Sequence, residues 1–132
     1  MASTKSLEEI LQNVHDLTNT AIQTIGVAGT ADLGVTGHNI TGVGDGVAVV
    51  TTAGTDVVLA ASTACKLVII QAQTDNTSKI AVGATGVDAT VATGTGILLD
   101  PGDSITLPID NLADIYIDSL VNGEGVRFTY LT

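Results

Sequence analysis

The sequence predicts a mainly β protein: a compact antiparallel β-sandwich or jelly-roll-like domain, preceded by an N-terminal α-helix and an extended glycine-rich arm. Two observations lead to this prediction. About eight short apolar runs recur at a spacing of roughly 8–12 residues with turn residues between them, which is typical of two-sheet sandwiches. The chain also holds 15 glycines and only 2% aromatic residues. Glycine and threonine disfavour helix interiors, and the core must be built from aliphatic side chains.

The stretch over residues 97–117 shows the β pattern most clearly. Pro101 and Gly102 predict a type II turn over residues 100–103, because proline presets a negative φ and glycine supplies the positive one. The six residues that follow alternate between apolar and other side chains, as in a strand with one buried face. By the same criteria we expect strands at residues 47–52, 56–61, 65–74, 78–84, 96–99, 104–109, 114–118 and 125–131.

Three finer expectations concern the arrangement of these strands. The run at residues 65–74 is apolar on both faces, so it should be a central strand of the sandwich or lie against a neighbour. Ala53, Gly54 and Thr55 predict a hairpin connection between the first two strands. Residues 85–96 are almost all small, which predicts an exposed insertion or a loop ordered by a neighbouring subunit.

One helix is expected near the N-terminus, over residues 6–24. Ser6 and Glu9 match a capping box, and apolar residues then recur at alternating spacings of three and four. A helix of about 15–19 residues is marginal alone in water, so its apolar face needs a partner. The predicted organisation is therefore residues 1–25 as an anchor or oligomerisation helix, 26–46 as a glycine-rich arm or linker, and 47–132 as the β-sandwich domain.

The apolar stripe of this helix is the candidate partner or oligomer interface. The stripe could pack on its own β domain, self-associate in a small parallel bundle, or dock on another protein. The long glycine-rich tract between the helix and the β domain favours the last two. We expect a homo-oligomer, with a trimer favoured, although a stripe this short also fits a dimer or heterologous docking. The stripe consists of Leu7, Ile10, Leu11, Val14, Leu17 and Ala21.

Charge and composition limit the kinds of partner that this chain is expected to bind. The net charge of −10 repels phosphate backbones, so the chain is not expected to bind nucleic acid. No apolar run approaches the roughly 20 residues needed to span a bilayer, and no secretory signal is recognisable at the N-terminus. We therefore expect a soluble protein that is made in a cytoplasm and does not associate with membranes. Cys65 opens an apolar strand, which predicts a small core residue rather than a reactive thiol.

The residue patterns predict no catalytic site, no cofactor and no metal site. His15 and His38 lack metal-ligand spacing, and no serine stands in a nucleophile elbow. Asp100 and Asp103 could be proposed for glycoside chemistry, but they share a tight turn without the aromatic platforms that line sugar sites. We interpret this pair as structural and the protein as not an enzyme.

Four segments are distinctive in combination: CKLVIIQ at residues 65–71, LDPGDS at 99–104, NLADIYID at 111–118 and GEGV at 123–126. Together with the N-terminal helix and the arm, they resemble small virion structural proteins of tailed bacteriophages. The resemblance covers about half of the chain and is a pattern of strands and turns. It implies a role on the capsid surface or at a fibre base, and hence a location in the virion.

We therefore expect a capsid decoration or cement protein that binds the head surface through its N-terminal helix and arm and stabilises the shell. Its partner would be the major capsid protein or another virion protein. One alternative is a short head-fibre, neck or tail-fibre base protein with a host-binding tip. An alternative of another class is a carbohydrate-binding module, although the scarcity of aromatic residues weighs against it.

Overall fold

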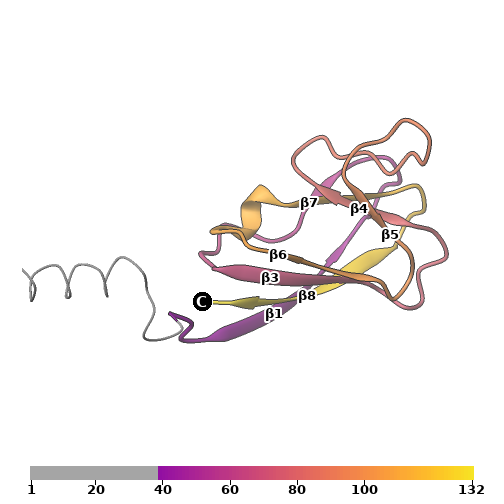
Figure 1. The fold of residues 1–132 in the computed structure, drawn as a ribbon. Coiled ribbons are helices and arrows are strands. Elements are labelled where there is room, and N and C mark those ends of the chain that lie inside the picture. Colours follow the sequence, from indigo (N-terminus) through magenta and orange to yellow (C-terminus); the bar gives the residue numbers. More distant parts are fainter. Residues whose placement is uncertain (1–38) are drawn as a thin grey trace, which may run out of the picture. The chain divides into compact units, whose positions relative to one another are not determined.

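The computed structural model describes residues 39–132, of which Ile40–Thr132 form one compact unit. Its strands build two four-stranded antiparallel sheets that face each other (Figure 1). One has the strand order β1-β8-β3-β6 and is called the β1 sheet below; the other, the β2 sheet, has the order β2-β7-β4-β5. The predicted β-sandwich is thus confirmed. The helix predicted over residues 6–24 lies outside the described residues.

Each of the eight predicted strands overlaps one strand of the structure, although most are shorter than predicted. A short 3-10 helix, η1 (Leu112–Asp114), precedes β7 and is capped by Asn111, whose side chain accepts from the Ala113 N–H. The strands are β1 (Val43–Val49), β2 (Val57–Val58), β3 (Leu67–Ala72), β4 (Ile80–Gly83), β5 (Ile97–Leu99), β6 (Ser104–Leu107), β7 (Tyr116–Ser119) and β8 (Gly125–Leu131).

The chain crosses repeatedly from one sheet to the other. β1 and β3 belong to the β1 sheet, whereas β2 and β4 belong to the β2 sheet. The hairpin predicted at residues 53–55 is therefore wrong. A turn does form there, with the Thr55 N–H donating to the Thr52 carbonyl, but β1 pairs with β8 and β2 pairs with β7. The predicted central strand is confirmed, because β3 lies between β8 and β6.

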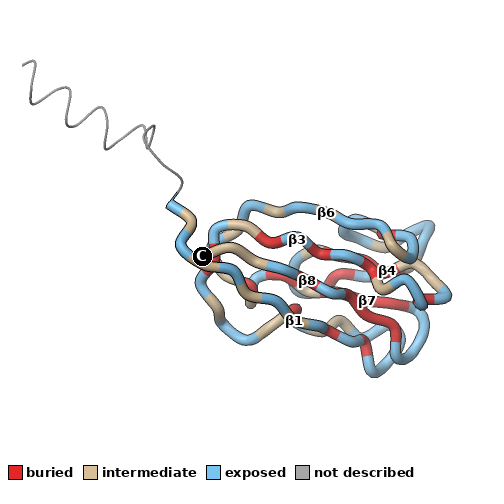
Figure 2. The backbone as a smooth tube through the Cα atoms, turned by 90° about the horizontal axis from the view of Figure 1, so that it is seen from below, coloured by how far each residue is buried: buried red, intermediate tan, exposed pale blue. Residues whose placement is uncertain are grey.

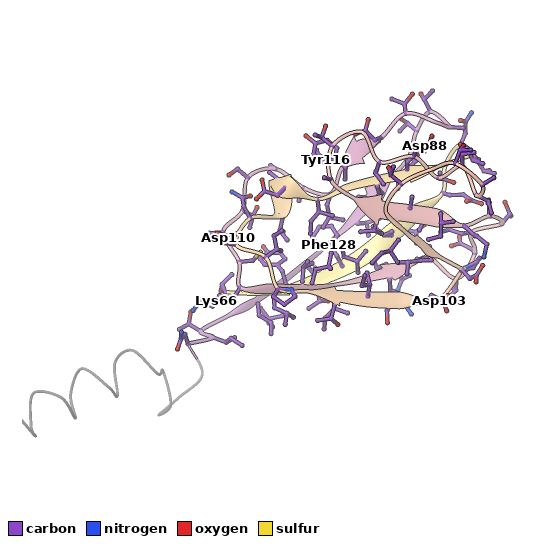
Figure 3. The ribbon with its side chains drawn as sticks, turned by 45° about the horizontal axis from the view of Figure 1, so that its top comes forward. Lys66, Asp88, Asp103, Asp110, Tyr116 and Phe128 are labelled. Carbon is purple, nitrogen blue, oxygen red and sulfur yellow. The ribbon has the colours of Figure 1, made fainter. Side chains whose placement is uncertain are left out.

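An aliphatic core fills the space between the sheets. Phe128 of β8 lies within this space (Figure 3). Burial alternates along β3 and β8, so that one face of each strand contributes to the core and the other faces outward (Figure 2). Cys65 is a core residue, as predicted. The other large core members are Val50, Leu59, Val68, Ile70, Ile80, Val82, Leu99, Leu112, Ile115, Ile117 and Val126.

The first strand begins at Val43, four residues earlier than predicted. Two of its three inward positions, Gly44 and Gly46, are glycines, which local propensity assigns to a flexible arm, and the third is Ala48 of the core. A Cβ on Gly44 would lie 2.3 Å from Cζ of Tyr130, and a Cβ on Gly46 would lie 2.4 Å from Cζ of Phe128. The two aromatic rings of β8 therefore occupy the space that side chains on β1 would need. The remainder of the predicted arm, up to residue 38, lies outside the described residues.

The type II turn predicted at Pro101 and Gly102 is confirmed. Gly102 has a φ of 86°, and the Asp103 N–H donates to the Asp100 carbonyl at 2.9 Å. The Asp103 carboxylate accepts from the Asp100 N–H at 3.2 Å, and the Asp100 carboxylate pairs with Lys79. The hydrogen bonds and the ion pair of these two aspartates hold the turn in place, which supports their interpretation as structural residues.

The long segment between β4 and β5 packs on the outer face of the β2 sheet. Val87 and Ala89 are buried there against Ala81 of β4, and Leu98 and Tyr116 border them. Figure 3 shows Tyr116 on this side of the sandwich. The prediction of an exposed insertion is therefore wrong for Val87 and Ala89, whereas most of residues 91–96 are exposed.

Gly46→Ala should lower the free energy of unfolding by about 1–3 kcal/mol, because the added Cβ forces the Phe128 ring to shift. Urea unfolding of the full chain measures this loss. Asp45→Ala, on the outward side of the same strand, is the matched control and should change stability by less than about 0.5 kcal/mol. In a Phe128→Leu background the alanine should cost clearly less; fully additive losses would contradict the ring-over-glycine explanation.

Candidate functional site

The predicted interface residues lie outside the described part of the chain. Leu7, Ile10, Leu11, Val14, Leu17 and Ala21 all precede residue 39, so the structure neither brings them together nor separates them. Within residues 39–132, two buried carboxylates and one exposed sheet surface are the candidates for function.

Glu124 is a buried carboxylate at the turn that leads into β8. Its Oε1 accepts from the Thr77 N–H, from the Thr77 hydroxyl at 2.6 Å and from the Ser78 N–H at 2.8 Å. Its Oε2 accepts from the Ser119 hydroxyl at 2.9 Å. One carboxylate therefore ties the connection between β3 and β4 to the end of β7.

The neighbouring Asn76 adds two further bonds to the same corner. Its side-chain amide donates to the Gly125 carbonyl at 2.9 Å, and its side-chain oxygen accepts from the Gly125 N–H at 3.1 Å. This reproduces the paired bonds of an antiparallel ladder, so the Asn76 side chain takes the place of a strand beside Gly125, next to the end of β3. Side chains of two buried residues thus cross-link the corner together with its backbone hydrogen bonds.

The hydrogen bonds set the charge of Glu124. Burial alone raises the pKa of this carboxyl, but the bonds from Thr77, Ser119 and Ser78 outweigh burial, and the pKa is lowered from its ordinary value. Glu124 is therefore ionised at neutral pH. A shallow cavity of about 180 Å³ lies beside it. Both of its oxygens already accept from the chain's own donors, which suits a structural carboxylate better than a general base.

The second buried carboxylate, Asp118 of β7, holds the segment between β4 and β5. Its Oδ2 accepts from the Ala89 N–H at 2.8 Å, and its Oδ1 has no hydrogen-bond partner among the described residues. Asp56 accepts from the Gly86 N–H at 2.8 Å and fixes the same segment nearer its start. These bonds explain how a segment of small residues can be held in place within one chain.

Other reactive chemistry is sparse in this part of the chain. Burial, and to a lesser extent the Asp110 charge, raises the pKa of the Cys65 thiol, which donates to the Ile109 carbonyl at 3.2 Å. Within residues 39–132, no three metal-ligating side chains cluster. The same residues contain no helix that is both long and apolar enough to cross a membrane.

The outer face of the β1 sheet is the third candidate. Here β1 exposes apolar side chains: Val43 is 70% exposed and Val47 is 58% exposed, and Ile69 of β3 is also exposed. Figure 2 shows this face, with exposed positions alternating along its strands. A shallow cavity of about 410 Å³ lies between Val47, Arg127 and their neighbours. Exposed apolar residues rimmed by polar ones are typical of protein interaction sites.

Charge is distributed unevenly around this face. Although the chain is strongly acidic, Asp45 is the only acidic residue on the strands of the β1 sheet, and Arg127 is the only basic one. The other acidic residues of the described part lie in turns, in loops, in η1 or in the interior. Depletion of charge together with an exposed arginine is the composition expected at the centre of a protein interface.

Sequence reasoning missed this surface. Residues 43–46 fall in the predicted arm because glycine has low strand propensity, whereas residues 47–49 fall in the predicted strand. The role of Glu124 is equally hidden in the sequence, because its partners come from two distant parts of the chain, Thr77–Ser78 and Ser119.

Glu124→Ala should lower the free energy of unfolding by about 2–4 kcal/mol, because the Thr77 and Ser78 N–H groups lose their acceptor. Denaturant unfolding measures the change. Asp75→Ala alters an exposed acid in the same connection and should cost less than about 0.5 kcal/mol. A similar loss in both variants would contradict the assignment.

Acid should also weaken this corner. Because the folded-state pKa of Glu124 is lowered, its stabilisation is present above the ordinary glutamate pKa of about 4.3 and is lost as the pH falls through the folded-state value. Wild type should therefore lose more stability on acidification than Glu124→Gln, in which the group cannot titrate. Thermal unfolding followed across the acid range checks this; parallel curves would contradict it.

Comparisons with known proteins leave the assignment to geometry. The chain matches no protein-family model, and a search of curated proteins found no match.

Proposed function

We propose that this chain is a virion structural protein of tailed bacteriophages, a capsid decoration or cement protein. In this proposal residues 1–25 and the arm bind the head surface, and the sandwich forms a knob displayed on the shell. Many weak apolar contacts, repeated by symmetry, would give the bound layer its avidity. The partner is the major capsid protein or another virion protein, and a trimer is the favoured oligomer.

The observation that carries the proposal is the self-sufficiency of the sandwich. Residues 40–132 form a compact unit with a closed core, and its chemistry offers structural carboxylates instead of a reactive centre. The first described residues enter beside the C-terminus, where Gly42 and Thr132 exchange backbone hydrogen bonds. The turn that holds Asp103 lies at the opposite end of the sheet (Figure 3). A segment that precedes residue 39 can thus anchor one end while the other stays free.

The strand order gives further support. The orders β1-β8-β3-β6 and β2-β7-β4-β5 are those of an eight-stranded jelly roll, which recurs in viral capsid and lectin domains. Because fold alone does not decide function, the aromatic residues help to choose between these classes. Phe128 is buried, and Tyr116 and Tyr130 pack against core clusters. None is left as an open platform for a sugar ring, which disfavours the carbohydrate-binding alternative.

Ile10→Asp with Val14→Asp should abolish binding to the head, because two charges would interrupt the apolar stripe. Purified variants are added to phage heads that lack the protein, and bound copies are counted by gel densitometry and cryo-electron microscopy. Gln12→Asp with Asn13→Asp adds the same charge at polar positions of the segment and should bind normally. Unchanged thermal unfolding of the sandwich shows that the fold is intact. Normal occupancy of the Ile10/Val14 variant would refute the anchor.

Cryo-electron microscopy of the same particles distinguishes a decoration protein from the fibre-base alternative. A decoration protein should occupy hundreds of positions on the icosahedral shell, whereas a head-fibre, neck or tail-fibre base should appear in few copies at defined vertices. The position and copy number in the reconstruction decide between them.

A further inference from the structure

Strand β1 forms an open edge of its sheet. It contains seven residues and pairs only with β8 within the described chain. The other edge strands are much shorter, with four residues in β6, three in β5 and two in β2. Long edge strands are unusual because their unpaired backbone groups can recruit another strand.

The backbone hydrogen bonds define which groups of β1 face the open side. Gly42 and Thr132 exchange two bonds, from the Gly42 N–H at 3.2 Å and from the Thr132 N–H at 2.9 Å. In an antiparallel ladder such pairs alternate, so the even-numbered residues of β1 bond to β8. The N–H and C=O groups of Val43, Asp45, Val47 and Val49 therefore point away from β8, and no described segment pairs with them.

The usual protections of an edge strand are weak here. β6 is short and is followed directly by Pro108, whereas β1 has no proline and no lysine. Asp45 is its only charged residue. Three of its four outward side chains are exposed valines, which are strong strand formers and add apolar surface to the open edge.

We infer that β1 pairs with β1 of a second copy of this chain, antiparallel and about a two-fold axis at Gly46. The axis places Val43 opposite Val49 of the partner and Asp45 opposite Val47 of the partner. The four residues of each copy whose backbone groups point to the open side then lie opposite the same set of residues in the other copy. About eight backbone hydrogen bonds can therefore form between the two strands. The two β1 sheets become one continuous sheet of eight strands.

The sequence of β1 is self-complementary in this register. The valines at its two ends meet each other, and the two Asp45 carboxylates do not lie opposite each other, as they would if the axis passed through Asp45. Arg127 of β8 lies beside Val47. Its long side chain can reach across Val47 toward Asp45 of the partner, because neighbouring strands are only about 4.8 Å apart. The single acid and single base of this sheet thus complement each other between copies.

A pair of charge variants tests both the contact and its register. Val43→Lys with Val49→Lys places like charges opposite each other at both ends, and Val43→Glu with Val49→Glu does the same. Each variant alone should self-associate at least about tenfold more weakly than wild type and should halve the mass of the assembly. An equimolar mixture should recover the wild-type mass, because every lysine then faces a glutamate. Sedimentation velocity of the full chain measures the masses.

Val91→Lys with Ile97→Lys is the matched control, since Val91 is 67% exposed and Ile97 is 50% exposed but neither lies on the β1 edge. This variant should associate as wild type does. Equal thermal unfolding midpoints of control and edge variants show that the fold is retained. A wild-type mass that the edge changes leave unaltered, or a lysine–glutamate mixture that does not reassociate, would overturn the inference.

The pairing uses a different surface from the proposed anchor, so the experiments can refute the edge pairing and the anchor separately. If the Ile10/Val14 variant no longer self-associates but the edge variants still do, the N-terminal segment holds the copies together. That result would overturn the edge pairing and leave the decoration proposal standing. Edge pairing that persists while the Ile10/Val14 variant still occupies heads would support the pairing and refute the anchor.

Discussion

The contact between the aromatic rings of β8 and the glycines of β1 governs the rest of the sandwich. Phe128 and Tyr130 are two of only three aromatic residues, and they fill the space beside Gly46 and Gly44. Two of the three inward positions of this strand are glycine and the third is Ala48, so the strand contributes little apolar area of its own and depends on the rings beside it. The outward side of the same strand carries Val43, Val47 and Val49, which are exposed.

Much of the fold follows from local sequence. The alternation in β3 and β8, the turn at Gly102 and the burial of Cys65 were predictable because each depends on side chains a few residues apart. The start of β1 was not, because the rings that favour glycine there lie more than 80 positions later in the chain. The false hairpin at Gly54 has the same origin. A turn is encoded locally, whereas the sheet that the next strand joins is decided by distant partners.

The candidate sites also differ in whether local sequence or distant partners determine them. An apolar stripe with helical spacing can be read directly, and so the sequence predicts the N-terminal interface at Leu7, Ile10 and Val14. An open edge cannot be read this way, because edge position is a property of strand order. Glu124 illustrates a further limit: one acid beside a glycine turn looks like a solvated residue until the Thr77, Ser78 and Ser119 donors converge on it.

The strong acidity of the chain is compatible with self-association because the charge is placed unevenly. Copies that carry ten net negative charges repel each other at long range, which disfavours unspecific contacts between turns and loops. Repulsion between folded copies is weakest where acids are few. On the strands of the β1 sheet, the negative charge of Asp45 is balanced by the positive charge of Arg127. At physiological ionic strength charges are screened over about 8 Å, so the immediate neighbours of a contact matter more than the total charge. The acidity is therefore compatible with the proposed pairing at the β1 edge, where acids are few and where backbone bonds and valines can outweigh the residual repulsion.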